Sequence, residues 1–315
     1  MQINRRELLI GQTHNNVFSR LDIVVRNSYL NSIGTKDYKK WQKIYNKMQR
    51  IRTGYNKHTN GLPWVEQFLL LDRSFAKNGY IENYPLIVNK DLHLINSSHR
   101  ASLCLHHAID EIPINIVDDW EQHLESKGVK SKTYFDYGVE WFEKNNFTKN
   151  EILEIISEKH KLFESTNLYF YAMLWPPAKK YFKQIEETIA TDFDILSVKK
   201  VDLKENFESI LKKIYEIDNI EEWKLNKKIS SIKKTSESRE IMILKIDLIN
   251  TQFRAKTKFP NCKISISAEE IKKKIRQNFQ KKIKDYYYDT IIHMSDNYDH
   301  VDHIKKVLKE YKIEN

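Results

Sequence analysis

The stretch that decides the fold covers residues 85–117 and reads PLIVNKDLHLINSSHRASLCLHHAIDEIPINIV. Its apolar and β-branched runs predict three short strands, at residues 85–88, 92–95 and 112–117. A polar turn at residues 89–91 separates the first two strands. Residues 101–108 carry apolar side chains at helical positions. The stretch therefore predicts a small layer of strands with one connecting helix.

A second polar turn precedes the predicted helix, and it contains Ser97, Ser98, His99 and Arg100. The start of a helix leaves backbone N–H groups without partners and carries the positive end of the helix dipole, so it attracts anions, phosphate above all. Arg100 adds a planar group that binds a phosphate through two hydrogen bonds. His99 either donates a hydrogen bond to the same anion or fixes the turn. The alternative interpretation is a capped helix with an exposed arginine and a hydrogen-bonded histidine.

The order and spacing of these features resemble the core of the ParB/sulfiredoxin superfamily. The matching positions are Pro85, Ile87, Val88, Leu92, His99, Arg100, Ile112, Pro113 and Ile114. Residues 64–78, followed by Gly79, resemble the helix that precedes this core, so the resemblance covers residues 62–117, about a sixth of the chain. It implies a ParB/sulfiredoxin-like α/β domain whose His-Arg turn faces nucleotide phosphates. The superfamily includes DNA-partition proteins that bind CTP, sulfiredoxins that use ATP, and free-serine kinases.

The turn itself departs from the superfamily's pattern. Most relatives have Asp-Gly or Gly-Gly before the His-Arg pair, where this chain has Ser97 and Ser98. The reactive cysteine of sulfiredoxins comes directly before that pair, and Ser98 stands there, which argues against sulfiredoxin chemistry. A side chain in place of a glycine crowds the phosphates, so a scaffold that kept the fold without the chemistry is one alternative.

Length and composition predict a folded, cytoplasmic chain of two domains. The 315 residues are 40% hydrophobic, which allows a sizeable core. The sequence contains neither an apolar run long enough for a bilayer nor a signal-peptide pattern at its start. Its two cysteines, Cys104 and Cys262, have no metal-ligand spacing and form no disulfide framework. Pro176 and Pro177 are the expected boundary, with domains at 1–175 and 178–315.

Positive charge is concentrated in the second domain. Residues 195–285 hold 23 Lys and Arg against 13 Asp and Glu, an excess equal to the +10 of the whole chain. A basic face binds nucleic acid, a phosphorylated small molecule or an anionic glycan carrier. Solvated lysines on helix surfaces are the plain alternative.

The remaining periodic segments predict a mixed α/β fold. In the first domain, helices are expected at 37–52, at 118–128 with Gly128 at its end, and from Thr148 to 165, where Thr148 and Glu151 form a capping-box pattern. Aromatic residues at 134–145 indicate a packing surface, and no basic recognition helix follows. In the second domain, helices are expected at 178–190, 203–217, 268–283 with Ser267 as its cap, and 298–311. Strands are expected between them, at 193–198, 241–249 and 290–293. This alternation of helices and strands predicts an α/β layer.

A second group of polar residues follows the predicted strand at 290–293. His293 ends that strand, and Asp296 and Asn297 come before the last helix, where α/β proteins place functional groups. Asp296 could hold Mg²⁺ or act as a general base, while His293 and Asn297 could contact substrate. The alternative is a helix cap. His300 and His303 lie three residues apart, but no cysteine or firm carboxylate partner completes a site, so we expect no metal there.

These features together predict a nucleotide-dependent phosphotransferase, a small-molecule kinase. Ser97, Ser98, His99 and Arg100 would contact the phosphates of ATP or another nucleotide, with Mg²⁺ bridging them. In the free-serine kinases a carboxylate from the N-terminal part of the fold activates the acceptor hydroxyl. Glu66 matches that carboxylate by position, and Asp296 is the other candidate; His99 completes the predicted catalytic set. The acceptor would be an amino acid or a sugar, in glycan or small-metabolite pathways.

Two other functions fit the same sequence. One is a ParB-like DNA-binding protein or a nuclease-like relative that uses the basic second domain on phosphates. The other is the scaffold without chemistry. Tight nucleotide binding separates the kinase from both, while a steep salt dependence of DNA affinity identifies the DNA-binding alternative.

Overall fold

The computed structural model describes residues 1–14, 17–80, 84–126, 137–218, 220–256, 259–283 and 290–314. The chain forms two compact units, unit 1 (Met1–Thr166) and unit 2 (Asn167–Asn315). The expected boundary at Pro176 lies inside unit 2 and is wrong. Two prolines need not separate domains, since proline is also favoured in the first turn of a helix, and here they begin the 3₁₀ helix η2 (Pro176–Tyr181).

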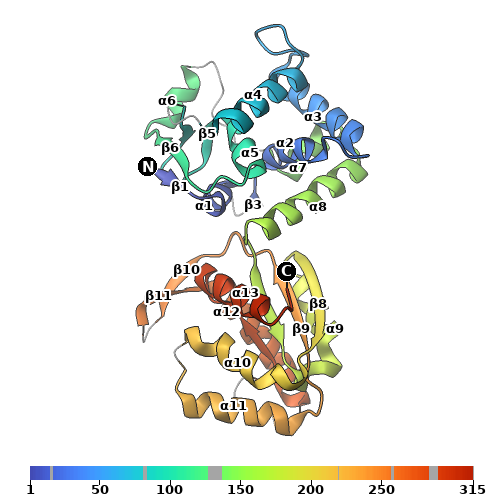
Figure 1. Ribbon diagram of the computed structural model, residues 1–315, viewed down its shortest axis with the longest axis vertical. Helices are drawn as coiled ribbons and strands as arrows, with labels where there is room; N and C mark the ends of the chain where they lie inside the picture. The colour runs from blue at the N-terminus through green and yellow to red at the C-terminus, as the bar shows by residue number, and fades with distance from the viewer. Residues whose placement is uncertain are drawn as a thin grey trace. The chain divides into compact units, whose positions relative to one another are not determined.

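Unit 1 is mixed α and β (Figure 1). Its elements, in chain order, are β1 (Gln2–Ile3), α1 (Arg5–Ile10), β2 (Thr13–His14), β3 (Val17–Phe18), α2 (Leu21–Ser32), α3 (Tyr38–Thr53), α4 (Trp64–Asn78), β4 (Leu86–Val88), β5 (Leu94–Asn96), α5 (Ser98–His106), β6 (Ile112–Ile116), α6 (Trp120–Glu125), α7 (Val139–Lys144) and α8 (Lys149–Ser165).

The sheet of unit 1 is built on the stretch that the sequence singles out. Its strand order is β1-β6-β4-β5, with β4 parallel to β6 and antiparallel to β5. Helix α5 lies between β5 and β6 in the chain, so it belongs to the crossover between two parallel neighbours. The three predicted strands and the helix of residues 85–117 are confirmed. The capping box of Thr148 and Glu151 is confirmed as well, because each side chain bonds the backbone N–H of the other residue.

Helix α2 is the central helix of unit 1. It packs against α3, α5 and α8, and nearly all of its residues are buried. Two of them, Asp22 and Arg26, are charged and fully enclosed. A helix that is buried on all sides is usually apolar all round, so these charges need partners inside the unit.

Gly11 marks a close backbone approach in unit 1. A Cβ at this position would lie 2.5 Å from the carbonyl oxygen of Leu92, a backbone atom that has little room to retreat. We therefore expect Gly11→Ala to lower the free energy of unfolding by about 2–3 kcal/mol, the upper part of the range for overpacking, because the atom it meets is backbone. Chemical denaturation with circular dichroism measures this change.

Gly54→Ala is the matched control for that experiment. Gly54 has a φ of 75° and nothing within 4 Å of a Cβ, so alanine there meets only the backbone preference, about 1 kcal/mol. An equal loss in the two variants would show that the contact between Gly11 and Leu92 is not tight.

Unit 2 is also mixed α and β. Its elements are β7 (Phe170–Leu174), η2, α9 (Phe182–Ala190), β8 (Ile195–Asp202), η3 (Lys204–Asn206), α10 (Phe207–Tyr215), η4 (Glu216–Asp218), α11 (Glu222–Thr235), β9 (Glu240–Ile246), β10 (Phe253–Lys256), β11 (Phe259–Ser265), α12 (Ile266–Phe279), η5 (Gln280–Lys282), β12 (Ile292–Met294) and α13 (Tyr298–Glu310).

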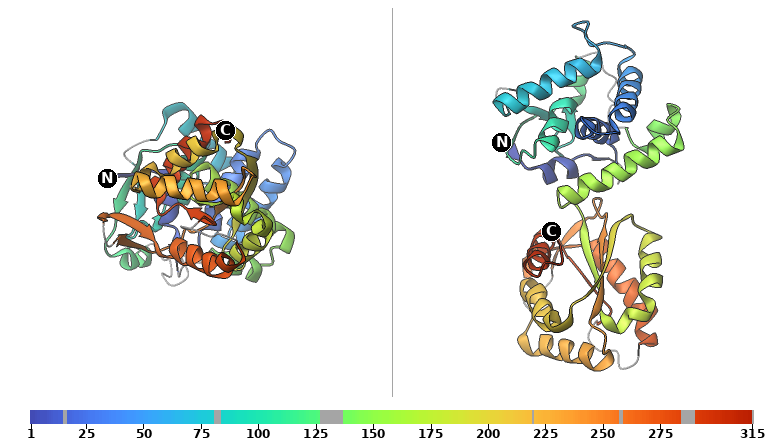
Figure 2. Two further views of the ribbon diagram at one scale, coloured as in Figure 1. Left: turned by 90° about the horizontal axis from the view of Figure 1, so that it is seen from below. Right: turned by 45° about the vertical axis from the view of Figure 1, so that its right-hand side comes forward.

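The main sheet of unit 2 lies between two helical layers. Its order is β12-β7-β9-β8, and every pair in it is antiparallel. Along β7, Tyr171 and Met173 join the core with α10, α11 and α13, whereas Phe170 and Ala172 join the core with α9 and α12. Figure 2 shows the helices on both sides of the sheet. Burial on both faces explains why β7 is apolar throughout instead of alternating.

Several elements of unit 2 were not predicted. The sequence did not identify β7, α11 or the β10–β11 hairpin. The cap of α12 is Ser265, whose hydroxyl accepts from Ala268 N at 3.0 Å, and not Ser267. In unit 1, Gly128 and the aromatic residues before Tyr137 lie outside the described residues. Within the described ranges, no helix is long and apolar enough to cross a membrane.

Candidate functional site

The backbone at the start of α5 has a conformation that favours glycine. Ser97, the residue before the helix, has φ 80° and ψ 28°, in the left-handed region. A serine caps a helix from an extended conformation, so here its hydroxyl forms no capping bond with any described N–H of the helix. The expected side-chain cap is therefore absent, and the first N–H groups of α5 have no side-chain acceptor among the described residues.

The Arg100 side chain folds back over this helix start. Its guanidinium donates hydrogen bonds to the Ser97 hydroxyl and to the Tyr84 carbonyl oxygen. It also lies 6.0 Å from the centre of the Tyr84 ring. A guanidinium has five N–H donors, so these two bonds fix its position and leave donors for an anion.

Arg100 also lines a cavity of about 260 Å³. The other lining residues are mostly apolar or aromatic and come from α4 and the segment after it: Leu71, Ser74, Phe75, Tyr80 and Tyr84. The Tyr80 hydroxyl donates to the Tyr84 carbonyl oxygen at 2.8 Å, and burial raises the pKa of Tyr80 to about 12. The cavity therefore combines a neutral aromatic wall with one fixed positive group, as small-molecule sites often do.

His99 points to a different part of the unit. Its ring packs edge-on against Phe68, with centroids 4.7 Å apart, and its Nε2 lies 2.9 Å from the Tyr45 hydroxyl and 3.3 Å from Gln49 Nε2. Gln49 Oε1 accepts from two arginines, so the Gln49 amide nitrogen faces His99 as a donor. His99 Nε2 is thus an acceptor and cannot donate to a phosphate.

The environment of His99 keeps its ring neutral. Burial, together with the positive charges of Arg26 and Arg52, lowers the pKa of His99 well below its ordinary value. The structure therefore turns the two members of the His-Arg pair to different neighbours. Arg100 lines the cavity, whereas His99 is held by α3 and α4.

A buried group of charged side chains lies behind the start of α5. The Asp22 carboxylate is 2.8 Å from Arg20 Nε, 2.7 Å from Arg26 Nη1 and 3.6 Å from Arg52 Nη2. Arg20, Arg26 and Asp22 are fully enclosed, and Arg52 is 11% exposed. Arg20 Nη2 donates to the Ser98 hydroxyl at 2.8 Å, which turns Ser98 inward.

This cluster has an excess of positive charge. Burial alone would raise the pKa of Asp22, but the three guanidiniums outweigh it and hold the pKa well below its usual range. Burial, with the charge of Arg52, lowers the pKa of Arg26 to about 10, so Arg26 is still protonated at neutral pH. One carboxylate for three guanidiniums leaves two positive charges that favour an anion nearby.

Glu66 is not brought to either side chain of the turn. It is exposed in the first turn of α4, two residues and so about 200° around the helix from Phe68, which contacts His99. It is also about 12 Å along the axis from Ser74, which lines the cavity. Position in the sequence alone could not distinguish the sides of this helix.

The three residues predicted in unit 2 have different surroundings. Asn297 caps α13, because its Oδ1 accepts from His300 N at 2.9 Å, and its Nδ2 donates to the Lys263 carbonyl at 2.8 Å. Both ends of this amide are thus used by the fold. Asp296 lies 2.5 Å from Lys272 Nζ. Burial, with the positive charge of Lys228 as the next cause, lowers the pKa of His293 well below its ordinary value.

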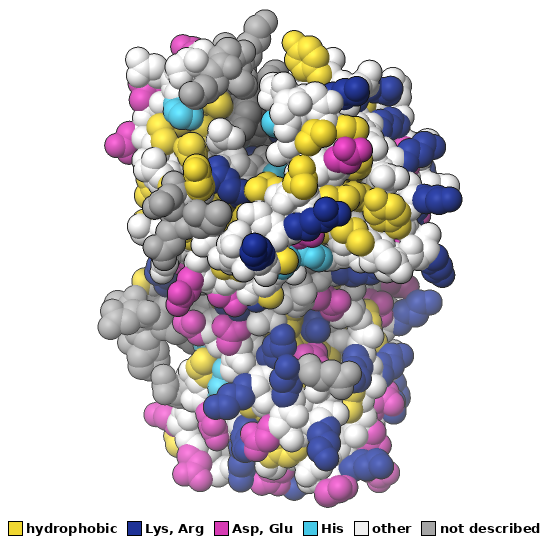
Figure 3. Space-filling view, turned by 45° about the horizontal axis from the view of Figure 1, so that its top comes forward, with side chains coloured by type: hydrophobic (Ala, Val, Ile, Leu, Met, Phe, Trp, Pro, Cys, Tyr) yellow, Lys and Arg dark blue, Asp and Glu magenta, His cyan; other side chains and the backbone are white. Residues whose placement is uncertain are grey.

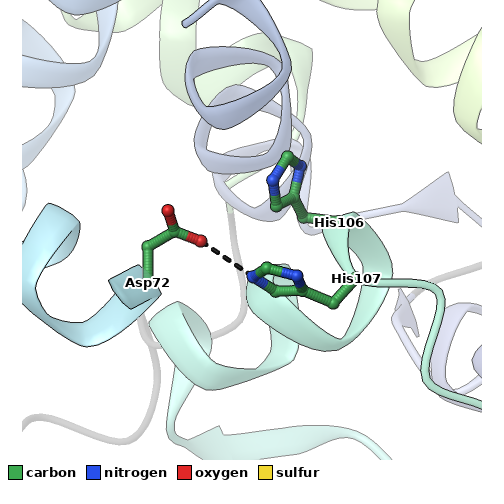
Figure 4. Close-up of side chains that lie close together, drawn as sticks. All are labelled: Asp72, His106 and His107. Atoms are coloured by element: carbon green, nitrogen blue, oxygen red, sulfur yellow. Dashed lines mark hydrogen bonds and ion pairs between the residues drawn. The ribbon is translucent and has the colours of Figure 1, made fainter. Parts of the chain in front are cut away.

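Unit 1 contains a further group that sequence reasoning missed, formed by Asp72, His106 and His107. Figure 4 shows the His107 ring turned toward the Asp72 carboxylate, with His106 beside it. His107 Nε2 is 2.8 Å from Asp72 Oδ1, and His106 Nδ1 is 2.6 Å from the side-chain oxygen of Asn31. One nitrogen of each imidazole therefore already has a hydrogen-bond partner. The adjacent histidines were visible in the sequence, but nothing there indicated Asp72.

Helix α3 presents a basic outer face that was also missed as a site. Its residues include six Lys and Arg and no acidic residue. A cavity of about 500 Å³ lies along it, lined by Lys43, Asn46, Lys47, Arg50, Asn56 and Pro63. Figure 3 shows Lys and Arg side chains down the right-hand margin of unit 1, the side where Figure 1 draws α3. The count of charges in the sequence pointed to unit 2 and so overlooked this helix.

Comparison with known proteins gives no further assignment: no family model, no curated protein and no solved structure matches this chain.

Proposed function

We propose that unit 1 binds a nucleotide with its phosphates at the start of α5, and that the chain is a nucleotide-dependent phosphotransferase. One observation carries this proposal. The Arg100 guanidinium is fixed over a helix start that no side chain among the described residues caps, and it lines a cavity with aromatic walls. A nucleotide needs both kinds of surface, because its base favours aromatic walls and its phosphates favour a guanidinium and helix N–H groups.

The surroundings of the helix start favour an anion further. The Arg20, Arg26 and Arg52 cluster, with its excess of positive charge, lies next to the start of α5, because Arg20 donates a hydrogen bond to the Ser98 hydroxyl. The resemblance of the sequence to the ParB/sulfiredoxin superfamily implies phosphates at the same turn. In this proposal Ser97 and Arg100 contact phosphate. His99 and Ser98 instead hold the helix in place, which revises the roles expected from the sequence.

The reaction that suits such a site is transfer of a phosphoryl group to a hydroxyl of an amino acid or a sugar. Catalysis of this kind comes from positioning and charge neutralisation rather than covalent chemistry. Mg²⁺ would accompany the nucleotide, held mainly by the phosphates and water. Arg100 would bind and orient the transferred group.

Arg100→Ala tests the proposal. Thermal unfolding is measured with ATP, ADP and CTP, each with Mg²⁺. A nucleotide at a hundred times its dissociation constant stabilises the native chain by about 2.7 kcal/mol, and Arg100→Ala is expected to lose that shift. Arg73→Ala, which removes an exposed arginine of α4, should keep it.

The same thermal unfolding assay also gives the outcome that would contradict the proposed nucleotide site. If no nucleotide shifts the native chain, or if Arg73→Ala and Arg100→Ala respond alike, the proposal fails. When a nucleotide does bind, production of ADP with amino acids and sugars as acceptors follows.

A second candidate function is nucleic-acid binding along α3. The basic cavity beside Lys43, Lys47 and Arg50 favours it, since a phosphate backbone follows rows of cations. This function predicts a DNA affinity that falls steeply with rising salt concentration. It also predicts that Lys43→Gln weakens DNA binding and leaves nucleotide binding unchanged. Both results together would support nucleic-acid binding over phosphotransfer.

A further inference from the structure

We propose that unit 2 binds one divalent transition-metal ion through two carboxylates and two imidazoles. The ligands are Asp218, His293, Asp296 and His300. They come from the end of η4, from β12, from the turn after β12 and from the first turn of α13. This site is independent of the nucleotide site proposed in unit 1.

Three of these side chains lie close enough together to share a metal ion, and His293 approaches one of them, Asp218. Ligand atoms of Asp218, Asp296 and His300 all lie within 4.8 Å of one another. His300 Nδ1 is 3.6 Å from Asp218 Oδ1, and His293 Nδ1 is 3.9 Å from Asp218 Oδ2. A tetrahedral ion about 2.1 Å from each ligand atom separates the ligand atoms by about 3.4 Å. Both imidazoles therefore face one carboxylate at a spacing too long for a hydrogen bond and suitable for a shared cation.

His293 supplies the independent observation. Its side chain is 8% exposed, and its Nδ1 is turned toward Asp218. Its Nε2 is buried with no hydrogen-bond partner among the residues that the structure describes. A buried imidazole without a hydrogen bond is costly. A metal ion at the Asp218 carboxylate would bind Nδ1, the nitrogen that faces this carboxylate, and would leave Nε2 as it is.

The fold holds the ligands in place before any ion binds. Ser265 N donates to the Asp296 carbonyl at 2.7 Å, and Tyr171 N donates to the Ser295 hydroxyl at 2.9 Å, so the turn after β12 is fixed on both sides. Asp296 N approaches His300 Nδ1 at 3.4 Å, a long contact that identifies Nδ1 as the unprotonated nitrogen, and a metal ion would take over this lone pair from the backbone N–H. Preorganised ligands of this kind bind a metal without a large rearrangement.

The ligand types select the kind of ion. Mg²⁺ and Ca²⁺ prefer oxygen ligands alone, whereas two imidazoles with two carboxylates suit Zn²⁺, Mn²⁺, Fe²⁺ or Co²⁺. His303, three residues after His300, is not part of the set, because its Nε2 lies 2.7 Å from the Lys213 carbonyl. The firm carboxylate that the sequence did not reveal is Asp218.

The Lys272 ammonium group would compete with the metal ion for the Asp296 carboxylate. Its Nζ lies 2.5 Å from Asp296 Oδ1, and its side chain is 14% exposed. The ammonium group neutralises the carboxylate that the ion would use. Replacing Lys272 therefore separates the two interpretations: a metal site binds its ion more tightly without the ammonium, while a purely structural ion pair is only weakened.

The experiment measures metal binding by the whole chain. The protein is treated with a chelator and titrated with Zn²⁺ by calorimetry and with Co²⁺ by visible absorption. We expect one ion in this site, about 100-fold weaker binding in Asp218→Asn, and about tenfold tighter binding in Lys272→Met. Asp299→Asn, an exposed neighbour on α13, should bind as the native chain does.

Two further measurements separate loss of the metal site from loss of the fold and from metal binding elsewhere in the chain. Circular dichroism checks that Asp218→Asn is folded, and the rise of its thermal midpoint with Zn²⁺ should be smaller than that of the native chain. His107→Gln removes the other histidine and aspartate group, in unit 1, and should leave this site unchanged. The proposal is overturned if the folded native chain binds no ion, if His107→Gln removes the bound ion while Asp218→Asn retains it, or if Lys272→Met fails to tighten binding. None of these results depends on nucleotide.

Discussion

Replacing Asp22 by Asn lowers the free energy of unfolding of unit 1 by about 3–5 kcal/mol, the cost of removing one partner from a buried ion pair. The carboxylate lies within 2.8 Å of Arg20 and 2.7 Å of Arg26 and has no exposed surface. Asparagine fills the same space, so the loss comes from charge rather than from a cavity. Three guanidiniums would remain with no buried negative partner.

Asp110→Asn provides the matched comparison. Asp110 pairs with Arg5 at 2.7 Å, a distance like those of Asp22, but its side chain is 61% exposed. Exposed ion pairs contribute at most about 1 kcal/mol. Chemical denaturation of both variants measures the difference, and equal losses would mean that the interior of unit 1 does not carry the charges as described.

Lowering the pH should reduce the unfolding free energy of the native chain more steeply than that of the Asp22→Asn variant. The pKa of Asp22 is held well below its ordinary value of 3.8 because the guanidiniums outweigh the effect of burial. Its stabilisation is therefore complete above the unfolded-state pKa and is lost as pH falls below it, where only the unfolded chain takes up the proton. Unfolding free energies between pH 5 and about pH 2 should converge for the two proteins.

The sequence predicted local structure well where neighbouring residues decide it. Strands, turn and helix between residues 85 and 117 follow from hydrophobic spacing and turn residues. Thr148 and Glu151 cap α8 as their spacing indicates, because both partners of a capping box lie within four residues. The helix at 64–78 with Gly79 after it is found with those bounds.

Features that depend on distant residues were not predicted. Strand β7 reads as an aromatic run, and only the helices on both of its faces explain that composition. Arginines are usually exposed, so the sequence alone does not indicate that Arg20 and Arg26 are buried. They are buried because α2, which begins next to Arg20 and contains Arg26, packs against α3 and α5. Asp218 joins His293 and His300 from a segment far earlier in the chain. No local pattern contains these partners.

The His-Arg turn shows how neighbours in sequence come to have different surroundings. Adjacent residues of a helix point about 100° apart, so His99 and Arg100 reach different surroundings. His99 meets Tyr45 and Gln49, while Arg100 reaches Ser97 and Tyr84. The sequence-based prediction that both side chains contact phosphate assumed that they point to the same place. The backbone of Ser97 could not be foreseen either, since serine rarely adopts a left-handed conformation.

Replacing Trp175 by Ala should lower the free energy of unfolding of unit 2 by about 3–5 kcal/mol, as large-to-small changes of buried aromatic residues do. Trp175 has no exposed surface and follows β7 directly. Its indole Nε1 donates to the Tyr215 hydroxyl at 3.2 Å, across the core that joins the sheet to α10. Alanine would remove this bond and leave a cavity between the sheet and its helical layer.

Trp223→Ala distinguishes burial from the mere loss of a tryptophan. Trp223 is 49% exposed on α11, so its removal should change the unfolding free energy by no more than about 0.5 kcal/mol. Trp175→Phe should fall between the two, because it keeps a ring in the core but removes the donor to Tyr215. Denaturation followed by far-ultraviolet circular dichroism measures all three. Similar losses for Trp175→Ala and Trp223→Ala would contradict the layered core of unit 2, since only an enclosed side chain leaves a cavity that the surrounding residues cannot fill.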